Sequence, residues 1–331
     1  MSRIQELMTY PDLRVSIGSS SAVETEREIP QSPSSCSTLV RGNTEGAIVS
    51  GVCHGTLGEL IQGPYLQGGE LHISLISLPI KQYSVVHFVC GEDGDIDVDL
   101  RGKDKCRKAI DLYLARYQQP LPHGRWMCDS ELLVGKGMAS STADIVATIR
   151  CLDRLFNAQS SPNVIAGILR ELERSDSVFL DTYALYLSGK QEIVQPFEGD
   201  PQFYACYIDE GNSVDTDKVG ASLLANYERH LSEYQANLER IVTAFRKRDW
   251  QEIARCATTS ARLSQNAVPK HKLEVLLSQQ QRYGADGIVV AHTGSLLGYL
   301  FIRKPSVTEM GELSAFFRGL GYPCRFVQTG F

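Results

Sequence analysis

A glycine- and serine-rich stretch near the middle of the chain has residue types that can bind a phosphate group. Residues 132–144 read Leu-Leu-Val-Gly-Lys-Gly-Met-Ala-Ser-Ser-Thr-Ala-Asp, so an apolar run ends in small residues just before an amphipathic segment of helical spacing. The first N–H groups of a helix are free, the helix dipole favours negative charge there, and small residues let a phosphate approach the backbone. The same stretch is also typical of a serine-capped helix that binds nothing. The residues that would form a phosphate cradle are Gly135, Lys136, Gly137, Met138, Ala139, Ser140 and Ser141.

Three side chains of this stretch could add chemistry to that of the backbone. The hydroxyls of Ser140 and Ser141 could ligate a Mg²⁺ ion bound to the phosphates, and Lys136 adds a mobile positive charge. The spacing is not that of a Walker A loop, in which the glycine-lysine pair is followed directly by serine or threonine. It also differs from the Gly-x-Gly-x-x-Gly of a dinucleotide-binding fold, because Ser140 stands where the third glycine would be.

The stretch resembles the second motif of the GHMP kinases, a superfamily that includes galactokinase, homoserine kinase and mevalonate kinase. That motif is usually written Pro-x-x-x-Gly-Leu-Gly-Ser-Ser-Ala, and residues 137–143 resemble its second half, with Ala139 in place of one glycine. Residues 54–63, His-Gly-Thr-Leu-Gly-Glu-Leu-Ile-Gln-Gly, resemble the opening motif of the L-threonine kinases within this superfamily. Residues 290–298, Val-Ala-His-Thr-Gly-Ser-Leu-Leu-Gly, resemble the counterpart of the third GHMP motif in the same branch. Three motifs in the expected order form a specific signal.

The resemblance implies an α+β, two-domain GHMP kinase fold with ATP bound between the domains. The first domain would have ribosomal protein S5 domain 2-like topology, and the second would be ferredoxin-like. We therefore expect an N-terminal ATP-binding domain over residues 47–198 and a C-terminal domain over residues 199–331. Residues 15–44 are rich in Ser, Glu, Pro and Thr and have little apolar periodicity, so residues 1–46 are predicted to be a poorly ordered extension.

The acidic residues for phosphoryl transfer are expected just after the next helix. This reaction needs a cradle for the triphosphate, a place for Mg²⁺, positive charge near the transferred group, and a group that orients or deprotonates the alcohol. Residues 171–177 resemble the Glu-Pro-Thr-Asp stretch of threonine kinases, with Arg174 and Ser175 in place of the proline and the threonine. Carried over by position, Asp176 becomes the base that accepts the hydroxyl proton, assisted by the charge of Lys136 in the phosphate-binding stretch. The resemblance further implies that Mg²⁺ is ligated by Ser140 or Ser141 and by Glu173 or Glu171.

The first and third motifs are expected to contact the acceptor. Glu59 is a charged residue between Leu57 and Leu60, where it could hold an ammonium group or could shape the loop by accepting backbone hydrogen bonds, and both interpretations remain open. A lone histidine such as His292, at the end of an apolar strand, is predicted to be a structural residue with satisfied hydrogen bonds. Glycine in the third motif permits close approach of the backbone to a ligand. The residues that we expect on the acceptor side are Thr56, Glu59, Gln62, Thr293, Gly294 and Ser295.

The resulting prediction is an ATP-dependent kinase for the side-chain hydroxyl of an amino acid. The resemblance implies conversion of L-threonine to O-phospho-L-threonine, in a cobalamin-type pathway. L-serine or an amino alcohol remains an alternative acceptor, because His54, Leu57 and Arg174 differ from the residues usual in the threonine kinases. A catalytically silent nucleotide-binding regulator and a decarboxylase-like reaction on the same fold are further alternatives.

Composition and charge limit the other classes of function. The chain has 331 residues, 43% of them hydrophobic, which suffices for a packed core in one large or two ordinary domains. A net charge of −6 argues against a general nucleic-acid surface, and no apolar run approaches the length of a membrane span. The nine cysteines lie singly, without zinc-site spacing. We expect a cytoplasmic protein whose partners are ATP, Mg²⁺ and a small molecule, with a homodimer left open.

Hydrophobic periodicity predicts strands and helices without strict alternation, which is typical of an α+β fold. In the first half, we predict strands over residues 70–80, 83–90, 95–100 and 129–134, a hairpin turn at residues 91–94, and helices over residues 105–117, 141–156 and 162–174. In the second half, we predict strands over residues 203–208, 287–291, 297–302 and 324–328, and helices over residues 219–247, 250–263 and 307–320.

Overall fold

The computed structural model describes residues 47–91, 97–98, 100, 102–121, 123–211 and 216–331, which all belong to one unit of the chain. The proposed extension over residues 1–46 lies outside the described residues, as do residues 92–94 of the expected hairpin turn. The described strands are β1 (Ile48–Gln67), β2 (Glu70–Cys90), β3 (Asp97–Val98), β4 (Gly124–Ser130), β5 (Ala184–Leu187), β6 (Glu192–Pro196), β7 (Tyr204–Asp209), β8 (Gly287–Val290), β9 (Leu296–Phe301) and β10 (Arg325–Gln328). The described helices are α2 (Asp104–Tyr117), α3 (Ser140–Leu155), α4 (Pro162–Arg170), α5 (Thr216–Arg229), α6 (Leu231–Lys247), α7 (Trp250–Ser264), α8 (Leu273–Gln279) and α9 (Val307–Gly319).

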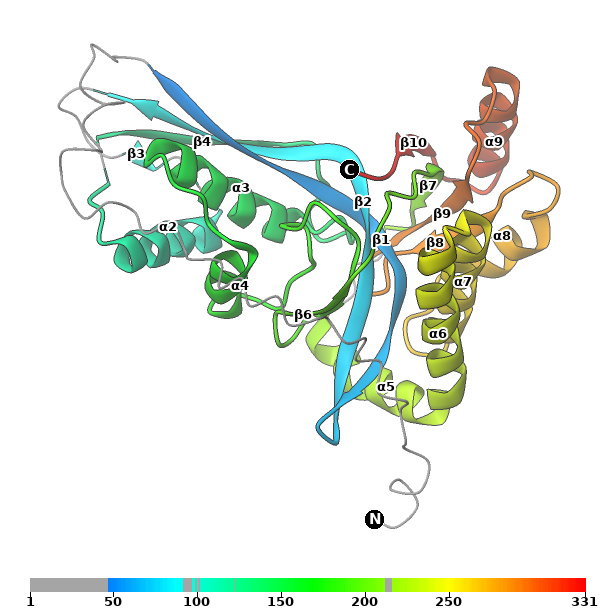
Figure 1. Cartoon of the computed structure of the whole chain (residues 1–331). Helices are drawn as coiled ribbons and strands as arrows, with labels where there is room; N and C mark the ends of the chain where they lie inside the picture. Colours follow the sequence, from blue (N-terminus) through cyan, green and yellow to red (C-terminus); the bar gives the residue numbers. More distant parts are fainter. Residues whose placement is uncertain (1–46, 92–96, 99, 101, 122, 212–215) are drawn as a thin grey trace. The chain divides into compact units, whose positions relative to one another are not determined.

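One sheet runs through both halves of the described chain (Figure 1). Its strand order is β10-β7-β9-β8-β1-β2-β4-β3, and β5 and β6 form a side branch on β2. The strands from the second half join those from the first half where β8 pairs with β1, through the residue pair Glu59 and Val290. A residue of the first motif and a residue of the third motif are therefore neighbours at this junction.

The long β1–β2 hairpin places the first motif at an irregular part of the sheet. Its turn contains Gly68 and Gly69, both with positive φ, which is the backbone that a tight hairpin turn requires. The register of β1 against β2 shifts between His54 and Ile61, and Gly58 within this interval has a φ of 60°. Bulges of this kind bend a strand and re-aim its side chains, and they often occur beside active sites.

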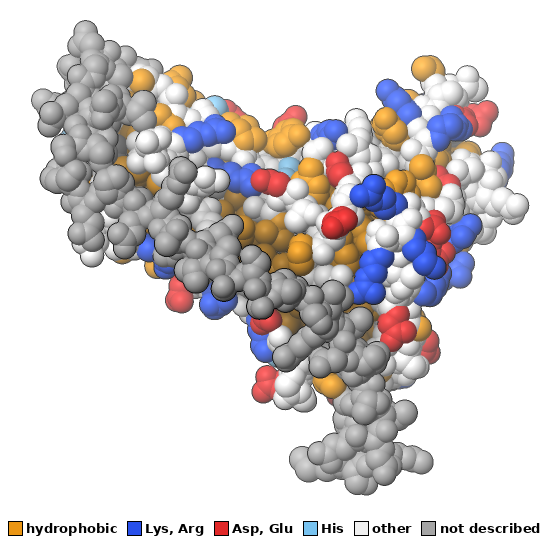
Figure 2. Space-filling model, viewed as in Figure 1, with side chains coloured by type: hydrophobic (Ala, Val, Ile, Leu, Met, Phe, Trp, Pro, Cys, Tyr) orange, Lys and Arg blue, Asp and Glu red, His pale blue; other side chains and the backbone are white. Residues whose placement is uncertain are grey.

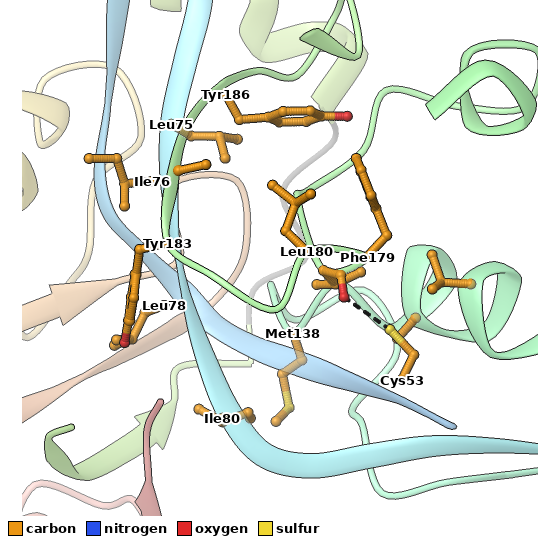
Figure 3. Close-up of a cluster of buried hydrophobic side chains, with 14 of the residues drawn as sticks. Cys53, Leu75, Ile76, Leu78, Ile80, Met138, Phe179, Leu180, Tyr183 and Tyr186 are labelled. Atoms are coloured by element: carbon orange, nitrogen blue, oxygen red, sulfur yellow. Dashed lines mark hydrogen bonds between the residues drawn. The ribbon is translucent and has the colours of Figure 1, made fainter. Parts of the chain in front are cut away.

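Helix α3 packs against β1 and β2 and is buried along almost its whole length. Its approach is so close that a Cβ added at Gly51 of β1 would lie 1.9 Å from the carbonyl oxygen of Ala147. Met138, just before the helix, is buried in the large apolar cluster of which Figure 3 shows a part. In the same view, the Cys53 thiol donates a hydrogen bond to the Val178 carbonyl oxygen at 3.3 Å. Leu132, which precedes the glycines of the phosphate-binding stretch, belongs to the same cluster, so the stretch is anchored to the core on both sides of its glycines.

Several predicted elements have different bounds in the structure. The strand expected at residues 129–134 ends at Ser130, because β4 pairs with β2 only up to the pair Ser84 and Ser130. The helix expected to reach residue 174 ends at Arg170, and the helix expected over residues 219–247 is interrupted at His230 between α5 and α6. The elements β1, β5, β6 and α8 were not predicted, whereas α2, α3, α7 and α9 lie within about two residues of the expected ranges.

The described part of the face in view carries acidic, basic and apolar side chains in mixture (Figure 2). Among the described helices, none combines the length and the apolar composition that crossing a membrane would require.

Candidate active site

The three motif segments lie against one another through backbone hydrogen bonds. From the β1 side, the N–H of Thr56 donates to the Met138 carbonyl oxygen at 3.1 Å, and the N–H of Gly58 donates to the Gly137 carbonyl oxygen at 3.0 Å. From the other side, the N–H of Ser295 donates to the Lys136 carbonyl oxygen at 3.1 Å. The loop between β4 and α3 is therefore held between the first and third motifs.

Two glycines make this close packing possible. A Cβ at Gly137, where φ is 93°, would lie 2.2 Å from the Cβ of Ala291, and a Cβ at Gly294 would lie 2.2 Å from the Lys136 carbonyl oxygen. Gly135 also has a positive φ, of 72°, but a Cβ there would meet nothing within 4 Å. The inner face of the loop is thus filled by protein, while its outer face is open to a ligand.

The start of α3 has the properties expected of an anion site. Ala139 precedes the helix in a left-handed conformation, with a φ of 52°, and its side chain cannot cap the free N–H groups. The first helical backbone bond runs from the N–H of Ala143 to the Ala139 carbonyl oxygen. Ser140 is buried, and its hydroxyl makes no hydrogen bond to another described residue. The N–H groups of the first turn are therefore available to an anion.

Glu173, one of the two glutamates predicted to ligate Mg²⁺, contacts the start of α3. Its carboxylate accepts hydrogen bonds from the hydroxyls of Ser141 at 2.8 Å and Thr142 at 2.6 Å, and it also pairs with Lys105. Glu171 is exposed, and its side chain has no hydrogen bond or ion pair with the described residues. Sequence reasoning missed Thr142 and Lys105, although Thr142 directly follows the two serines of the motif.

The oxygen donors around Glu173 fit a Mg²⁺ ion in chemical type. Magnesium prefers oxygen ligands and is usually bound by one or two carboxylates together with phosphates and waters. The Ser141 hydroxyl and the Glu173 carboxylate are in contact at the start of α3. Among the described residues, this site included, no cluster of three or more His, Cys, Asp or Glu residues is arranged to hold a metal, so phosphate oxygens and waters would have to supply the other ligands.

Lys136 is turned toward the second half of the chain. Its ammonium lies 3.2 Å from a carboxylate oxygen of Asp209 and donates to the Gly211 carbonyl oxygen at 3.3 Å. Burial of the Asp209 carboxyl opposes its ionisation, but hydrogen bonds from Ser295, the N–H of Gly211 and Lys136 outweigh this effect and lower its pKa. The charge of Lys136 is therefore shared with an acid that sequence reasoning did not single out.

Asp176 and Glu59 form an acidic pair on the other side of the first motif. The hydroxyl of Ser77 donates to Asp176 Oδ1 at 3.2 Å, and Ser77 is the strand partner of Glu59. Burial of the Asp176 carboxyl and the negative charge of Glu59 raise the pKa of Asp176 to about 7. A carboxyl with this pKa can accept or release a proton near neutral pH.

A chain of hydrogen bonds connects Glu59 to α7. Glu59 Oε2 accepts from the N–H of His292 at 3.0 Å and lies 2.8 Å from His292 Nδ1. The other ring nitrogen, Nε2, lies 2.8 Å from the hydroxyl oxygen of Ser260. That oxygen also accepts from the N–H of Gln62 at 3.1 Å, and the Gln62 side chain donates to the Tyr227 hydroxyl at 3.2 Å. Two expected acceptor-side residues, Glu59 and Gln62, are thus brought together by contacts that the sequence does not reveal.

The remaining expected acceptor residues lie at the same junction. Thr56 is 1% exposed, and its hydroxyl is buried without a hydrogen-bond partner. Thr293 is partly exposed, whereas Gly294 and Ser295 are buried in contact with the phosphate-binding loop. Lys270, which sequence reasoning missed, donates to the Gly294 carbonyl oxygen at 2.7 Å. Burial lowers the pKa of this lysine to about 8, against the opposing charges of Glu210 and Glu59.

The chain is similar in sequence to known kinases. Residues 104–189 match the family described as GHMP kinases N terminal domain. The L-threonine kinase of Citrobacter freundii is 27% identical over 256 residues, which cover 76% of this chain and 86% of that protein. The L-threonine kinase of Salmonella typhimurium is 26% identical over 263 residues, covering 76% of this chain and 82% of that protein.

The fold is shared with solved structures at low sequence identity. The mevalonate kinase of Methanococcus jannaschii superposes with a TM-score of 0.64 over 88% of this chain and 100% of that chain, at 12% identity. This likeness concerns the fold alone, but the family match and the threonine kinase relatives add a likeness in sequence. The chain therefore has the two-domain GHMP kinase fold, and over residues 104–189 its sequence matches the N-terminal domain of the GHMP kinases.

Proposed function

We propose that this protein is an ATP-dependent kinase that phosphorylates the side-chain hydroxyl of an amino acid, with L-threonine as the favoured acceptor. The observation that carries the proposal is the junction of the three motifs. There the backbone of Gly58 bonds the phosphate-binding loop, while the next residue, Glu59, influences the pKa of Asp176. A phosphate donor and an alcohol acceptor bound on the two sides of this junction would meet.

The donor side consists of the loop and the acids that contact it. Residues 135–141 would surround the phosphates through backbone N–H groups. Ser141 and Glu173, with Ser140 at the same helix start, would hold Mg²⁺. The ion would neutralise charge on the phosphates when bound. Lys136 would give up its contact with Asp209 and place its ammonium beside the phosphates.

The acceptor side contains the base. Asp176 would orient the acceptor hydroxyl and take its proton as the phosphoryl group is transferred. Its raised pKa supports this role, because a carboxylate with a pKa of about 7 is a stronger base than an ordinary one. Thr56, Glu59, Gln62 and residues 293–295 would form the wall around the acceptor. The identity of the curated relatives as L-threonine kinases supports the choice of L-threonine.

Release of ADP in the presence of different acceptors tests the proposal. We expect turnover with L-threonine, less with L-serine or amino alcohols, and dependence on Mg²⁺. Replacing Asp176 with Asn should lower kcat by about 100-fold or more, because the base is lost. Asp181→Asn is the matched control, since Asp181 is an exposed carboxylate that pairs only with Arg150 at 3.4 Å among the described residues.

A second pair of variants tests the metal side. Glu173→Gln should raise the Mg²⁺ concentration needed for half-maximal turnover, because the carboxylate that contacts Ser141 is lost. Glu171→Gln should leave it unchanged, because Glu171 does not contact the loop. Full activity of the Asp176 and Glu173 variants would contradict the assignment of the site, and absence of turnover with every hydroxyl acceptor would contradict the proposed function.

A further inference from the structure

We propose that Glu59 binds the ammonium group of the acceptor and that His292, fixed by Ser260, holds Glu59 in position for this purpose. The inference rests on the proposed function and deepens it, because it restricts the acceptor to alcohols that carry a cationic amine.

Glu59 is a buried carboxylate that accepts hydrogen bonds at only one of its two oxygens. The residue is 5% exposed, and both of its hydrogen bonds from His292 reach the same oxygen, Oε2. Among the described residues, none donates a hydrogen bond to the other oxygen, Oε1. A buried polar atom without a hydrogen bond is costly, so Oε1 of this carboxylate favours a ligand that donates hydrogen bonds and carries positive charge. Three residues earlier on β1, the Thr56 hydroxyl is also buried without a hydrogen-bond partner.

The contacts of His292 define its role as a positioning residue. With a proton on Nδ1 it donates to Glu59, and its Nε2 then accepts the proton of the Ser260 hydroxyl. Ser260 is itself fixed by the N–H of Gln62 and is fully buried. Both nitrogens of the ring are therefore used, and the ring cannot turn without breaking a hydrogen bond. His292 itself has no free group to offer to a substrate.

The charges around Glu59 favour an amine over an anion. Asp176 lies across Ser77 and is also acidic, so a ligand carboxylate would be repelled from this corner. Lys270 is the buried cation whose charge interacts with Glu59, but its ammonium donates to the Gly294 carbonyl oxygen and makes no ion pair with Glu59. A ligand ammonium, with three donors and a positive charge, could bond to Glu59 Oε1 directly.

Three alcohols, tested as acceptors, distinguish the contribution of the substrate's ammonium group from that of its carboxylate. L-Threonine carries both an ammonium and a carboxylate, 1-amino-2-propanol lacks the carboxylate, and 3-hydroxybutanoate lacks the amine. We expect the protein to use both amine-bearing alcohols and to use 3-hydroxybutanoate at least about 10-fold less efficiently. Glu59→Gln should lower kcat/KM by about 10- to 100-fold for the two amines, the range for hydrogen bonds to charged groups. The same variant should change kcat/KM for 3-hydroxybutanoate by less than about threefold.

Variants of His292 test the positioning role. His292→Leu removes the side-chain donor to Glu59, so the KM for L-threonine should rise by about 10-fold with little change in kcat. His292→Asn should retain most of the affinity, because its amide can donate from nearly the position of Nδ1. Ser260→Ala removes the bond that fixes the far side of the ring and leaves the Glu59 contact in place, so it should raise KM in the same direction but by less. Thr259→Ala is the matched control, because the Thr259 hydroxyl donates to the Arg255 carbonyl oxygen of its own helix. Thermal unfolding of each variant establishes that it is folded.

The outcomes are distinguishable from failure of the proposed function. Equal use of 3-hydroxybutanoate and L-threonine, or an equal loss for all three acceptors in Glu59→Gln, would overturn the inference while leaving a kinase. If no acceptor is phosphorylated, the proposed function fails. Calorimetric titration without nucleotide then decides the inference: L-threonine should bind the unmodified protein more tightly than 3-hydroxybutanoate does, and the difference should vanish in His292→Leu. Equal or absent binding of the two ligands would overturn it.

Discussion

At the scale of single residues, the feature with the clearest functional consequence is the acidic pair of Asp176 and Glu59. Two neighbouring carboxyl groups do not both ionise easily. Burial and the charge of Glu59 raise the pKa of Asp176 to about 7. Glu59 accepts two hydrogen bonds from His292, whereas Asp176 accepts one from Ser77. The environment thus distinguishes two chemically similar side chains.

The raised pKa predicts the pH dependence of catalysis. As a base, Asp176 acts only when it has lost its proton, so kcat/KM should increase as the pH rises through about 7 and level off above it. An ordinary aspartate would already be ionised and would give a flat profile in that range. The measurement is kcat/KM for L-threonine at saturating Mg²⁺ and ATP across the range. A profile without this inflection would contradict the assignment of Asp176 as the base.

The same group predicts how stability depends on pH. Because the pKa of Asp176 is higher in the folded protein than its ordinary value, folding favours the protonated form, and stability is lost as the pH rises from about 4 to about 7. Asp176→Asn removes the ionisable group, so at pH 8 it should stabilise the fold by about 1–3 kcal/mol. Below pH 4 the gain should disappear. Urea unfolding at both pH values measures the effect, with Asp181→Asn as a control that we expect to show no gain. A destabilised Asp176→Asn at pH 8 would refute the argument.

At the scale of elements, the loop before α3 contains two glycines with different structural roles. Gly135 and Gly137 both have positive φ, but only Gly137 packs against the third motif. Ala139 adopts a similar left-handed conformation without being glycine, a conformation that is unfavourable for a residue with a side chain. The loop therefore stores some strain next to the surface that would receive the phosphates.

Alanine at the two glycines separates backbone strain from packing. Gly135→Ala should cost about 1–2 kcal/mol, because only its backbone conformation is unfavourable. Gly137→Ala should cost about 2–5 kcal/mol, since its new Cβ would also collide with that of Ala291. It should weaken ATP binding as well, by separating the loop from the third motif. Denaturant unfolding and equilibrium binding of ATP measure the two effects. Equal losses of stability would mean that the contact with Ala291 is not important.

The elements also show which parts of the fold could be predicted. Hydrophobic periodicity predicted α3 and α9, and the structure adds a capping box of Ser306 and Glu309 at the start of α9. Strand β1 was missed because it is rich in glycine and is buried over most of its length, so it lacks the alternation of a half-exposed strand. Helix α4 ends at Arg170, four residues earlier than predicted. The residues after it are held by a long-range contact instead, in which the buried Ser175 hydroxyl donates to the side chain of Gln191, 16 residues away.

At the scale of the whole described molecule, the two halves share a core as well as a sheet. Phe245 of α6 stacks on Phe197, with ring centroids 4.3 Å apart, and lies 5.6 Å from Tyr183. The main buried cluster contains residues from both sides of the boundary expected at residues 198 and 199. The domain boundaries themselves stay a prediction, and so do the homodimer and the location in the cytoplasm.

The shared core predicts that the halves unfold together. The chain has two tryptophans, Trp126 in the first half and Trp250 in the second. Trp250→Phe leaves a single tryptophan in the first half, and Trp126→Phe leaves a single tryptophan in the second half. Denaturation curves followed by the two probes should have midpoints that coincide, which is a test for a single cooperative transition. Two separate midpoints would show that the halves are independent.

The candidate site could be predicted only in part, because its residues come from distant parts of the sequence. The motifs identified Ser141, Glu173, Asp176 and Glu59, which the structure brings to one region. No local pattern relates Lys136 to Asp209 or Glu59 to His292, since these contacts join residues far apart along the chain. Lys270 lies in an irregular segment before α8, where periodicity carries no signal.

The pairing of Glu59 with Val290 has a consequence for biosynthesis. A ribosome releases the N-terminal part of a protein first, so β1 and the glycine loop emerge while β8 and β9 have not yet been translated. A nascent chain of that length lacks the histidine that anchors Glu59, and it can recognise no acceptor even if the nucleotide loop has already formed. If Glu59 binds the acceptor as proposed, phosphate transfer would require that β8 and β9 have been translated, and proteolytic removal of these two strands would abolish it.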